Sequence, residues 1–337
     1  MTGANNALTV DFNGYADAFT AGNGNDTVSG SEGAATITLG NGNDTVSAGG
    51  YANRITVGNG NDSITSGSDG TTISAGGGND TITLAGFGNT LTAGDGDDTV
   101  SGGQSSNTIT LGNGHDSISE TGFANTVVVG NGNDSIMAGA GAESVQAGGG
   151  NDTIQLAGYA NTVSAGDGNN TVSGGEGGNT VTLGNGNNSV TLGGMNNAIT
   201  LGNGTNVVDA GSGSDIVHLS GGNTLLTVSG SGDVVFLGGS SATIMDNSAG
   251  LTLNVSAGGT DVVQTFGGCE RRRGGPARRG RRLPVGGGCR HGADERWPWR
   301  VDAEPGQHFL HRLRRTPAGG VLRFQLQDRM NRAVGAP

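Results

Sequence analysis

Residues 39–56 read LGNGNDTVS followed by AGGYANRIT, and this stretch decides the fold. Each nine-residue half contains a glycine-rich turn and then a polar, apolar, polar triplet. Alternation with a period of two and a β-branched residue at the centre predicts a short strand, with Val46 facing one side and Thr45 and Ser47 the other. Glycine reaches backbone angles that other residues avoid, and Asn and Asp favour turns. Nine residues therefore suffice for one strand and one reversal of the chain.

The same unit recurs with a period of 18 residues, as in a solenoid. The aspartates that mark it are Asp26, Asp44, Asp62, Asp80, Asp98, Asp116, Asp134 and Asp152, and the series continues as Asn170, Asn188 and Asn206. A weaker series lies halfway between these positions, at Asn53, Asn89, Asn107, Asn125, Asn161, Asn179 and Asn197. Acid returns at Asp215, nine residues after Asn206, and at Asp233, whereas Asp246 and Asp261 are out of register with the repeat.

Two strands and two turns for every 18 residues predict one coil of a parallel β-roll, an all-β solenoid. We expect a thin core of inward-facing residues, which includes Ile37, Val46, Ile55, Ile64, Ile73 and Ile82. With strands about 4.8 Å apart, about 12 coils would make a roll of roughly 58 Å. The expected organisation is an N-terminal lead-in and cap at 1–19, repeats at 20–235, degenerate terminal coils at 236–268, and an irregular Arg/Pro/Gly-rich tail at 269–337.

Charge divides the chain at residue 268. Up to that residue there are 23 acidic side chains and one basic one, Arg54, for a net charge of −22, and beyond it there are 16 Arg and 6 acids, for a net charge of +10. An acidic body repels nucleic acid and anionic membranes and attracts multivalent cations. Residues 1–20 lack the features of a cleavable signal peptide, and no stretch is long and apolar enough to span a bilayer. Charge alone therefore predicts a metal ion as the partner.

Stacked identical turns would place the eight aspartates in one column along an edge of the roll, about 4.8 Å apart. Bare carboxylates at this spacing repel one another. A hard divalent cation between successive turns removes the repulsion and takes six or more oxygen ligands from carboxylates and turn carbonyls. In the alternative interpretation, Asn and Asp serve only as turn formers and no ion binds. Because Asn would serve a turn equally well, the persistence of Asp over eight coils favours the metal.

The repeat resembles the repeats-in-toxin (RTX) nonapeptide G-G-x-G-x-D-x-U-x, in which U is a large apolar residue. Residues 75–83, AGGGNDTIT, depart from it only at the first position. The resemblance implies Ca²⁺ as the cofactor, held by the aspartate column from Asp26 to Asp152 and by carbonyl groups of its Gly-x-Gly turns. The glycines of these turns are Gly22, Gly24, Gly40, Gly42, Gly58, Gly60, Gly76, Gly78, Gly94, Gly96, Gly112, Gly114, Gly130, Gly132, Gly148 and Gly150.

The sequence departs from the family pattern in three ways. Position one is Ala, Leu or Val, every second nonapeptide has Asn in place of Asp, and Asn replaces Asp at 170, 188 and 206. We therefore expect calcium ions along one edge, mainly between Asp26 and Asp152.

RTX-like proteins usually leave bacteria through a one-step channel that reads an uncleaved C-terminal signal, so the resemblance implies a secreted, extracellular protein. A polyanionic, glycine-rich chain has little to hold it folded where calcium is scarce, and millimolar calcium outside the cell would trigger folding. We expect a structural or adhesive module that contacts a cell surface or a polysaccharide. An enzyme is disfavoured, because the body contains only two histidines, His115 and His218, and no lysine.

The alternative function is ice binding. Outward strand positions would form Thr ladders, among them Thr81/Thr83, Thr90/Thr92, Thr108/Thr110 and Thr180/Thr182. Flat Thr and Asn arrays of this kind resemble the ice-contacting faces of some antifreeze solenoids and ice adhesins. The simpler interpretation is that Thr suits a solvated strand face.

An apolar file is expected on the edge opposite the aspartates, because large side chains recur there every 36 residues, at Tyr51, Phe87, Phe123, Tyr159 and Met195. Such rings either cover the glycine of a neighbouring coil or form a sugar- or surface-binding strip.

The tail is chemically different from the body. Its Cys and His residues, Cys269, Cys289, His291, His308 and His311, match no ordinary zinc spacing, and nucleic-acid binding by its Arg cluster is disfavoured. The abrupt change at residue 268 favours a shifted reading frame, which the coding DNA would test.

Overall fold

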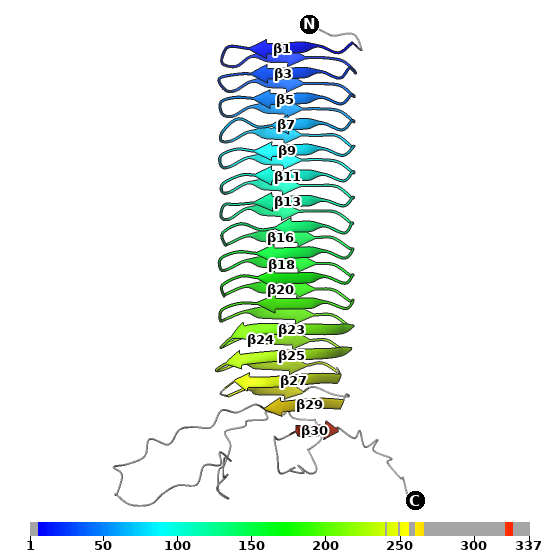
Figure 1. Cartoon of the computed structure of the whole chain (residues 1–337), viewed down its shortest axis with the longest axis vertical. Helices are drawn as coiled ribbons and strands as arrows, with labels where there is room; N and C mark the ends of the chain where they lie inside the picture. Colours follow the sequence, from blue (N-terminus) through cyan, green and yellow to red (C-terminus); the bar gives the residue numbers. More distant parts are fainter. Residues whose placement is uncertain (1–5, 240, 249, 256–259, 266–320, 326–337) are drawn as a thin grey trace, which may run out of the picture.

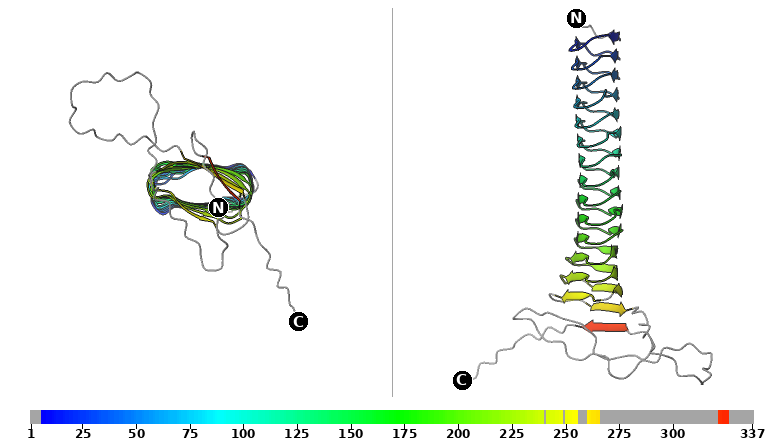
Figure 2. Two further views of the ribbon diagram at one scale, coloured as in Figure 1. Left: turned by 90° about the horizontal axis from the view of Figure 1, so that it is seen from below. Right: turned by 90° about the vertical axis from the view of Figure 1, so that its left-hand side faces the viewer.

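The computed structural model describes residues 6–239, 241–248, 250–255, 260–265 and 321–325. These residues form a parallel β-solenoid, in which the chain winds up a long, straight column with the N-terminus at one end (Figure 1). Seen along its axis, the roll is a flattened ring with two sheets facing each other (Figure 2). None of the described residues belongs to a helix long and apolar enough to cross a membrane.

Within the described residues, the first sheet has 16 strands and the second has 14. The first sheet contains, in spatial order, β1 (Thr9–Phe12), β3 (Thr27–Gly30), β5 (Thr45–Ala48), β7 (Ser63–Thr65), β9 (Thr81–Leu84), β11 (Thr99–Gly102), β13 (Ser117–Glu120), β15 (Ser135–Met137), β17 (Thr153–Leu156), β19 (Thr171–Gly174), β21 (Ser189–Leu192), β23 (Thr205–Ser212), β25 (Asn223–Gly230), β27 (Ser241–Ser248), β29 (Thr260–Thr265) and β30 (Val321–Gln325). The second contains β2 (Ala18–Thr20), β4 (Thr36–Thr38), β6 (Arg54–Thr56), β8 (Thr72–Ser74), β10 (Thr90–Thr92), β12 (Thr108–Thr110), β14 (Thr126–Val128), β16 (Ser144–Ala147), β18 (Thr162–Ala165), β20 (Thr180–Leu183), β22 (Ala198–Leu201), β24 (Ile216–Leu219), β26 (Val234–Leu237) and β28 (Thr252–Val255).

The register of the strands repeats the sequence period. Over the regular coils each residue pairs with the residue 18 positions further on, as Thr90 does with Thr108 and Ile55 with Ile73. The prediction of an all-β parallel roll with two strands per 18-residue coil is therefore confirmed. Coiling is already in register at β1 and β2, within the segment 1–19 that we expected to be a cap.

The core is a ladder of aliphatic side chains between the two sheets. The inward residues predicted from the alternation, Ile37, Val46, Ile55, Ile64, Ile73 and Ile82, are all at most 1% exposed. Complete burial of one Val, Leu or Ile stabilises a fold by about 1.5–3 kcal/mol. Since each coil is thin and contributes few such residues, the remaining stability has to come from the edges, where the turns stack.

The roll changes towards its C-terminal end. Strands β23, β25 and β27 each have 8 residues, against 3 or 4 in the preceding coils, and an irregularity lies between Asp209 and Ser212. From the tail the structure describes only β30, which pairs antiparallel with β29. The cysteines and histidines weighed as zinc ligands in the tail lie outside the described residues.

Candidate metal-binding column

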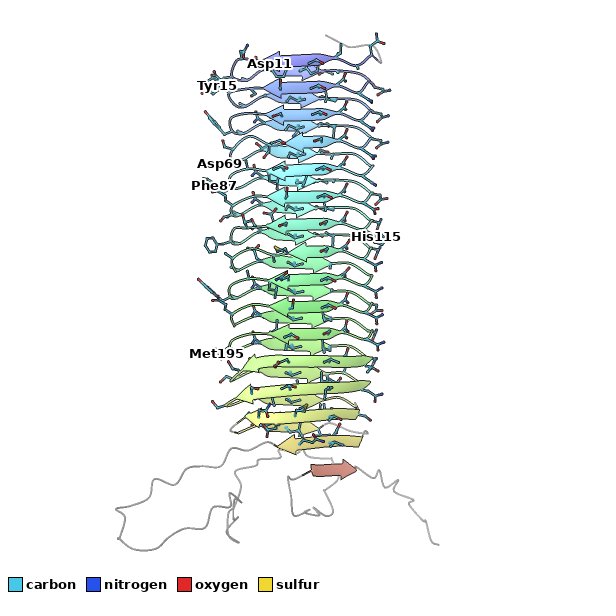
Figure 3. All side chains as sticks on the ribbon, viewed as in Figure 1. Asp11, Tyr15, Asp69, Phe87, His115 and Met195 are labelled. Atoms are coloured by element: carbon cyan, nitrogen blue, oxygen red, sulfur yellow. The ribbon has the colours of Figure 1, made fainter. Side chains whose placement is uncertain are left out.

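Each predicted aspartate lies at the end of a glycine-rich turn and directly before a strand of the first sheet. Asp44 precedes β5 and Asp116 precedes β13, and these turns form the edge on which Figure 3 labels His115. The turns are tight. At Gly60 the backbone φ is +155°, and a Cβ there would collide with the carbonyl oxygen of Gly42 in the preceding coil. Glycine two residues before the aspartate is therefore a steric requirement of the stacking.

The eight aspartate side chains point into the roll and form one continuous column. They are only 1–2% exposed. In every one of them, Oδ1 accepts a hydrogen bond from the backbone N–H of the residue 18 positions earlier, with N···O distances of 2.7–3.1 Å from Leu8 at the start to Asp134 at the end. The column therefore ties each coil to the previous one through one carboxylate oxygen.

The second carboxylate oxygen has no protein partner. Oδ2 is buried without a hydrogen bond in Asp26, Asp44, Asp62, Asp80, Asp98, Asp116, Asp134 and Asp152. A buried polar group without a partner is rare in folded proteins, and the cost is larger when the group is charged. The first 268 residues contain a single basic side chain, Arg54, which lies exposed on the second sheet. The described residues up to 268 thus supply no Lys or Arg as a counter-charge for this column, and among them only His115 lies near enough to lower the pKa of Asp116 and Asp134.

The coils with asparagine show which group fits beside this oxygen. Asn170 occupies the same column, and its Oδ1 accepts the N–H of Asp152 at 3.0 Å. Its Nδ2 donates to the carbonyl oxygens of Gly166 at 3.0 Å and Gly168 at 3.5 Å. Asn188 repeats both contacts, with Gly184 at 3.2 Å and Gly186 at 3.3 Å.

In an aspartate coil the oxygen Oδ2 stands in the place of that amide nitrogen. The glycines four and two residues earlier belong to the Gly-x-Gly pairs predicted to supply carbonyl ligands. In the aspartate coils, the carboxylate Oδ2 therefore lies next to the carbonyl oxygens of these two glycines. In the asparagine coils, Nδ2 lies there instead and donates to those carbonyl oxygens. This donor set, a carboxylate and backbone carbonyls, is the one that a hard divalent cation takes.

The electrostatics of the column agree with this interpretation. Burial raises the pKa of Asp62, Asp80, Asp98 and Asp116 to about 6, against an ordinary value of 3.8. The N–H donated by the preceding coil lowers the pKa, and the neighbouring carboxylate raises it further. The ion-free column therefore resists carrying its full negative charge, and a bound cation would relieve that resistance.

Some acids lie differently from what the repeat suggested. Asp215 and Asp233 follow the weaker series, since Asp215 Oδ1 accepts the N–H of Asn197 at 2.8 Å, and so they lie on the opposite edge from the aspartate column. Asp261, expected to be out of register, is buried and accepts the N–H of Ala242 at 2.9 Å across 19 residues. Asp261 is out of register by one residue, as predicted, and the structure shows that the stacking nevertheless continues, because this coil contains one extra residue.

Two buried glutamates on the opposite edge, Glu120 and Glu143, carried no periodic signal and were missed. That edge also carries the expected apolar file, which is extended by Tyr15 (Figure 3). Its side chains are 53–62% exposed, and they alternate with small residues such as Gly33, whose added Cβ would meet the ring of Tyr51 at 3.5 Å.

A parallel roll whose stacked turns bury a column of carboxylates next to carbonyl oxygens defines a class of cation-binding solenoids. The family model of the RTX calcium-binding nonapeptide repeat matches residues 13–46, 38–73, 71–87, 85–118, 121–154, 157–190 and 192–226. The chain belongs to this family and is a calcium-binding repeat protein. Neither a curated protein nor a solved structure matches it significantly.

Proposed function

We propose that this chain is an extracellular structural or adhesive module of bacterial type, whose aspartate coils fold when calcium fills the column from Asp26 to Asp152. One observation carries the proposal, namely eight consecutive buried Oδ2 atoms without a partner, at the place where Asn170 and Asn188 put an amide N–H. A chain that needed only a turn former at these positions would be satisfied by asparagine throughout.

The proposed ligands are the aspartate Oδ2 atoms and the carbonyl oxygens of the Gly-x-Gly turns, from Gly22 and Gly24 to Gly148 and Gly150. In the described residues no three His, Cys, Asp or Glu side chains converge on one point. Backbone carbonyls must therefore provide most of the six to eight oxygens that calcium takes. Calcium supplies positive charge there, and the residues of this chain supply the rigid spacing and exclude water.

The same energetics support an extracellular location. Without cations, a body of net charge −22 with its acids buried loses stability, and millimolar extracellular calcium restores it. Proteins with this repeat are typically secreted by bacteria. One-step export of an unfolded chain is compatible with a roll that folds only in the calcium outside the cell. The long straight shape and the exposed apolar file support a role in contact with a cell surface or a polysaccharide.

Ice binding is a second candidate, favoured by the in-register pairing of Thr90 with Thr108 and of Thr92 with Thr110 on one flat sheet. The array is interrupted on the same sheet by Arg54 and Gln146. Thermal hysteresis of the calcium-loaded chain, measured against the chelated chain, distinguishes this function from adhesion.

The experiment that tests the proposal is hydrogen exchange of the full chain in calcium and in a strong chelator, with circular dichroism and calorimetric calcium titration alongside. Chelation should abolish amide protection from β3 to β17 and leave more protection in the asparagine coils around β19 and β21. Adhesion is measured as calcium-dependent retention on insoluble polysaccharides or cells. Equal protection of the aspartate coils with and without calcium would overturn the folding proposal.

A further inference from the structure

The edge opposite the aspartate column is held together by asparagines. Asn89 Oδ1 accepts the backbone N–H of Thr71 at 2.9 Å, and Asn107 Oδ1 accepts that of Asn89 at 2.9 Å. Several of these asparagines also close their own turn, since Asn89 Nδ2 donates to the carbonyl oxygen of Ala85 at 2.8 Å and Asn161 Nδ2 to that of Ala157 at 3.1 Å. Where asparagine continues, the edge is neutral and its polar groups have protein partners.

Glu143 interrupts this series. Its side chain is only 2% exposed and stands in the asparagine column, where Oε2 accepts the N–H of Asn125 at 2.8 Å and Oε1 faces Asn125 Nδ2 at 3.5 Å. Burial raises its pKa to about 7, while the N–H groups of Asn125 and Gly141 oppose the rise. A buried carboxylate has therefore replaced a neutral amide in the middle of this series, well before Asp215 and Asp233 do so at its C-terminal end.

A second carboxylate enters the same region from β13. Glu120 pairs with Gly102 of β11 and occupies a position that is Ala48 in β5 and Leu84 in β9, where the side chain faces the core. It is only 2% exposed, and neither of its carboxylate oxygens has a hydrogen bond of good geometry, although the side-chain amide of Asn107 lies nearby. An added Cβ on Gly103 would meet Oε2 of Glu120, so glycine leaves the space that this carboxylate fills.

The two acids act on each other. Burial raises the pKa of Glu120 to about 8, the charge of Glu143 raises it further, and the amide of Asn107 opposes the rise. Like-charged groups placed together inside a protein need either a proton or a cation between them. No basic residue of the first 268 lies on this edge, since the only one is Arg54 on the outer face of β6.

We propose that Glu120 and Glu143 hold one calcium ion on the asparagine edge, at a site separate from the nonapeptide column. The two carboxylates together with turn carbonyls provide the oxygen donors that calcium prefers. Mg²⁺ would keep most of its water, for which so enclosed a position is poorly suited. The site rests on its own residues and does not require the aspartate column to bind ions.

The test compares the number of calcium ions bound by the full chain and by its variants Glu120→Gln and Glu143→Gln, measured by calorimetry and by metal analysis after equilibrium dialysis. Each substitution keeps the shape and removes one charge, and each should lower the count by one ion. Glu176→Gln is the matched control, because Glu176 lies exposed in a turn of the same edge, and its count should stay at that of the unmodified chain.

A second variant, Glu120→Ala, is expected to fold, because alanine already occupies the equivalent position in β5. It should also bind one calcium ion fewer than the unmodified chain. An unchanged count in folded Glu120→Gln, together with higher thermal stability in chelator, would overturn the proposal and assign the pair a shared proton. If Asp116→Asn binds fewer ions and Glu120→Gln does not, the proposed glutamate site is contradicted, whereas the proposal for the aspartate column stands.

Discussion

The aspartate coils up to Asp152 and the asparagine coils from Asn170 to Asn206 share one backbone and differ in one functional group per coil. Strands pair in the same register on both sides of the boundary, and the inner side chain accepts the same N–H from the previous coil. The asparagine coils complete their turns with Nδ2, whereas the aspartate coils present a bare oxygen there. We therefore expect the asparagine coils to be stable without an ion and the aspartate coils to need a cation beside Oδ2.

This difference is large on the scale of a thin solenoid. A neutral hydrogen bond contributes about 0.5–1.5 kcal/mol to stability, whereas a buried acceptor without a partner costs about 1–3 kcal/mol, and more when it is charged. Over consecutive coils that contact only their neighbours, such terms accumulate. We therefore expect the same molecule to contain a region whose stability depends on calcium and a region whose stability does not.

The largest expected effect comes from exchanging the groups. The triple variant Asn170→Asp, Asn188→Asp, Asn206→Asp should lose about 1–3 kcal/mol of stability per site in chelator, because each site exchanges a donor for a bare oxygen. Denaturant unfolding in chelator and in calcium measures it, and calcium should restore most of the loss. The control with the same charge is Asn151→Asp, Asn169→Asp, Asn187→Asp, whose side chains are exposed. Equal losses in both variants would mean that net charge alone separates the two regions.

A smaller effect is expected from pH. Since burial holds the pKa of Asp62, Asp80 and Asp98 at about 6 against 3.8, the folded ion-free chain binds more protons than the unfolded chain between these values. The stability that the ion-free fold gains from this proton binding is fully present below about pH 4 and is lost as pH rises through about 6. Calcium affinity should rise over the same interval, because the aspartates lose their protons. Unfolding in chelator at several pH values measures it. A roll that gains stability towards neutral pH without calcium would contradict the assignment.

The smallest effect should be the same in both regions. Asn59 and Asn185 lie exposed at equivalent outer turn positions, where their Oδ1 atoms accept the N–H of Gly77 at 3.1 Å and of Asn203 at 3.0 Å. Asn59→Ala and Asn185→Ala should each cost about 0.5–1.5 kcal/mol, with no dependence on calcium. Urea unfolding of the two variants gives the comparison. A calcium-dependent loss at Asn59 alone would place part of the metal chemistry in the outer ladder.

The fold was predictable because the strands of the regular coils carry the same two signals, a central aliphatic residue and a glycine-rich turn at a fixed spacing. The position of the aspartate column followed from the same period. The sequence did not predict that Oδ1 of each aspartate accepts an N–H while Oδ2 has no protein partner. This depends on the stacking distance and on the turn carbonyls of the folded coil. Glu120 and Glu143 escaped prediction for a simpler reason, since single substitutions carry no periodic signal. The sequence showed that Asp261 is out of register but did not show that its coil still stacks.

The uniform register has a consequence for how the chain reaches its folded state. A strand such as β9 pairs with β7 and β11, whose residues lie 18 positions away in either direction, so the regular coils form without pairing to a distant segment. Short loops close quickly and at low entropic cost. The regular coils can therefore form one after another along the chain, each on the surface of the coil before it.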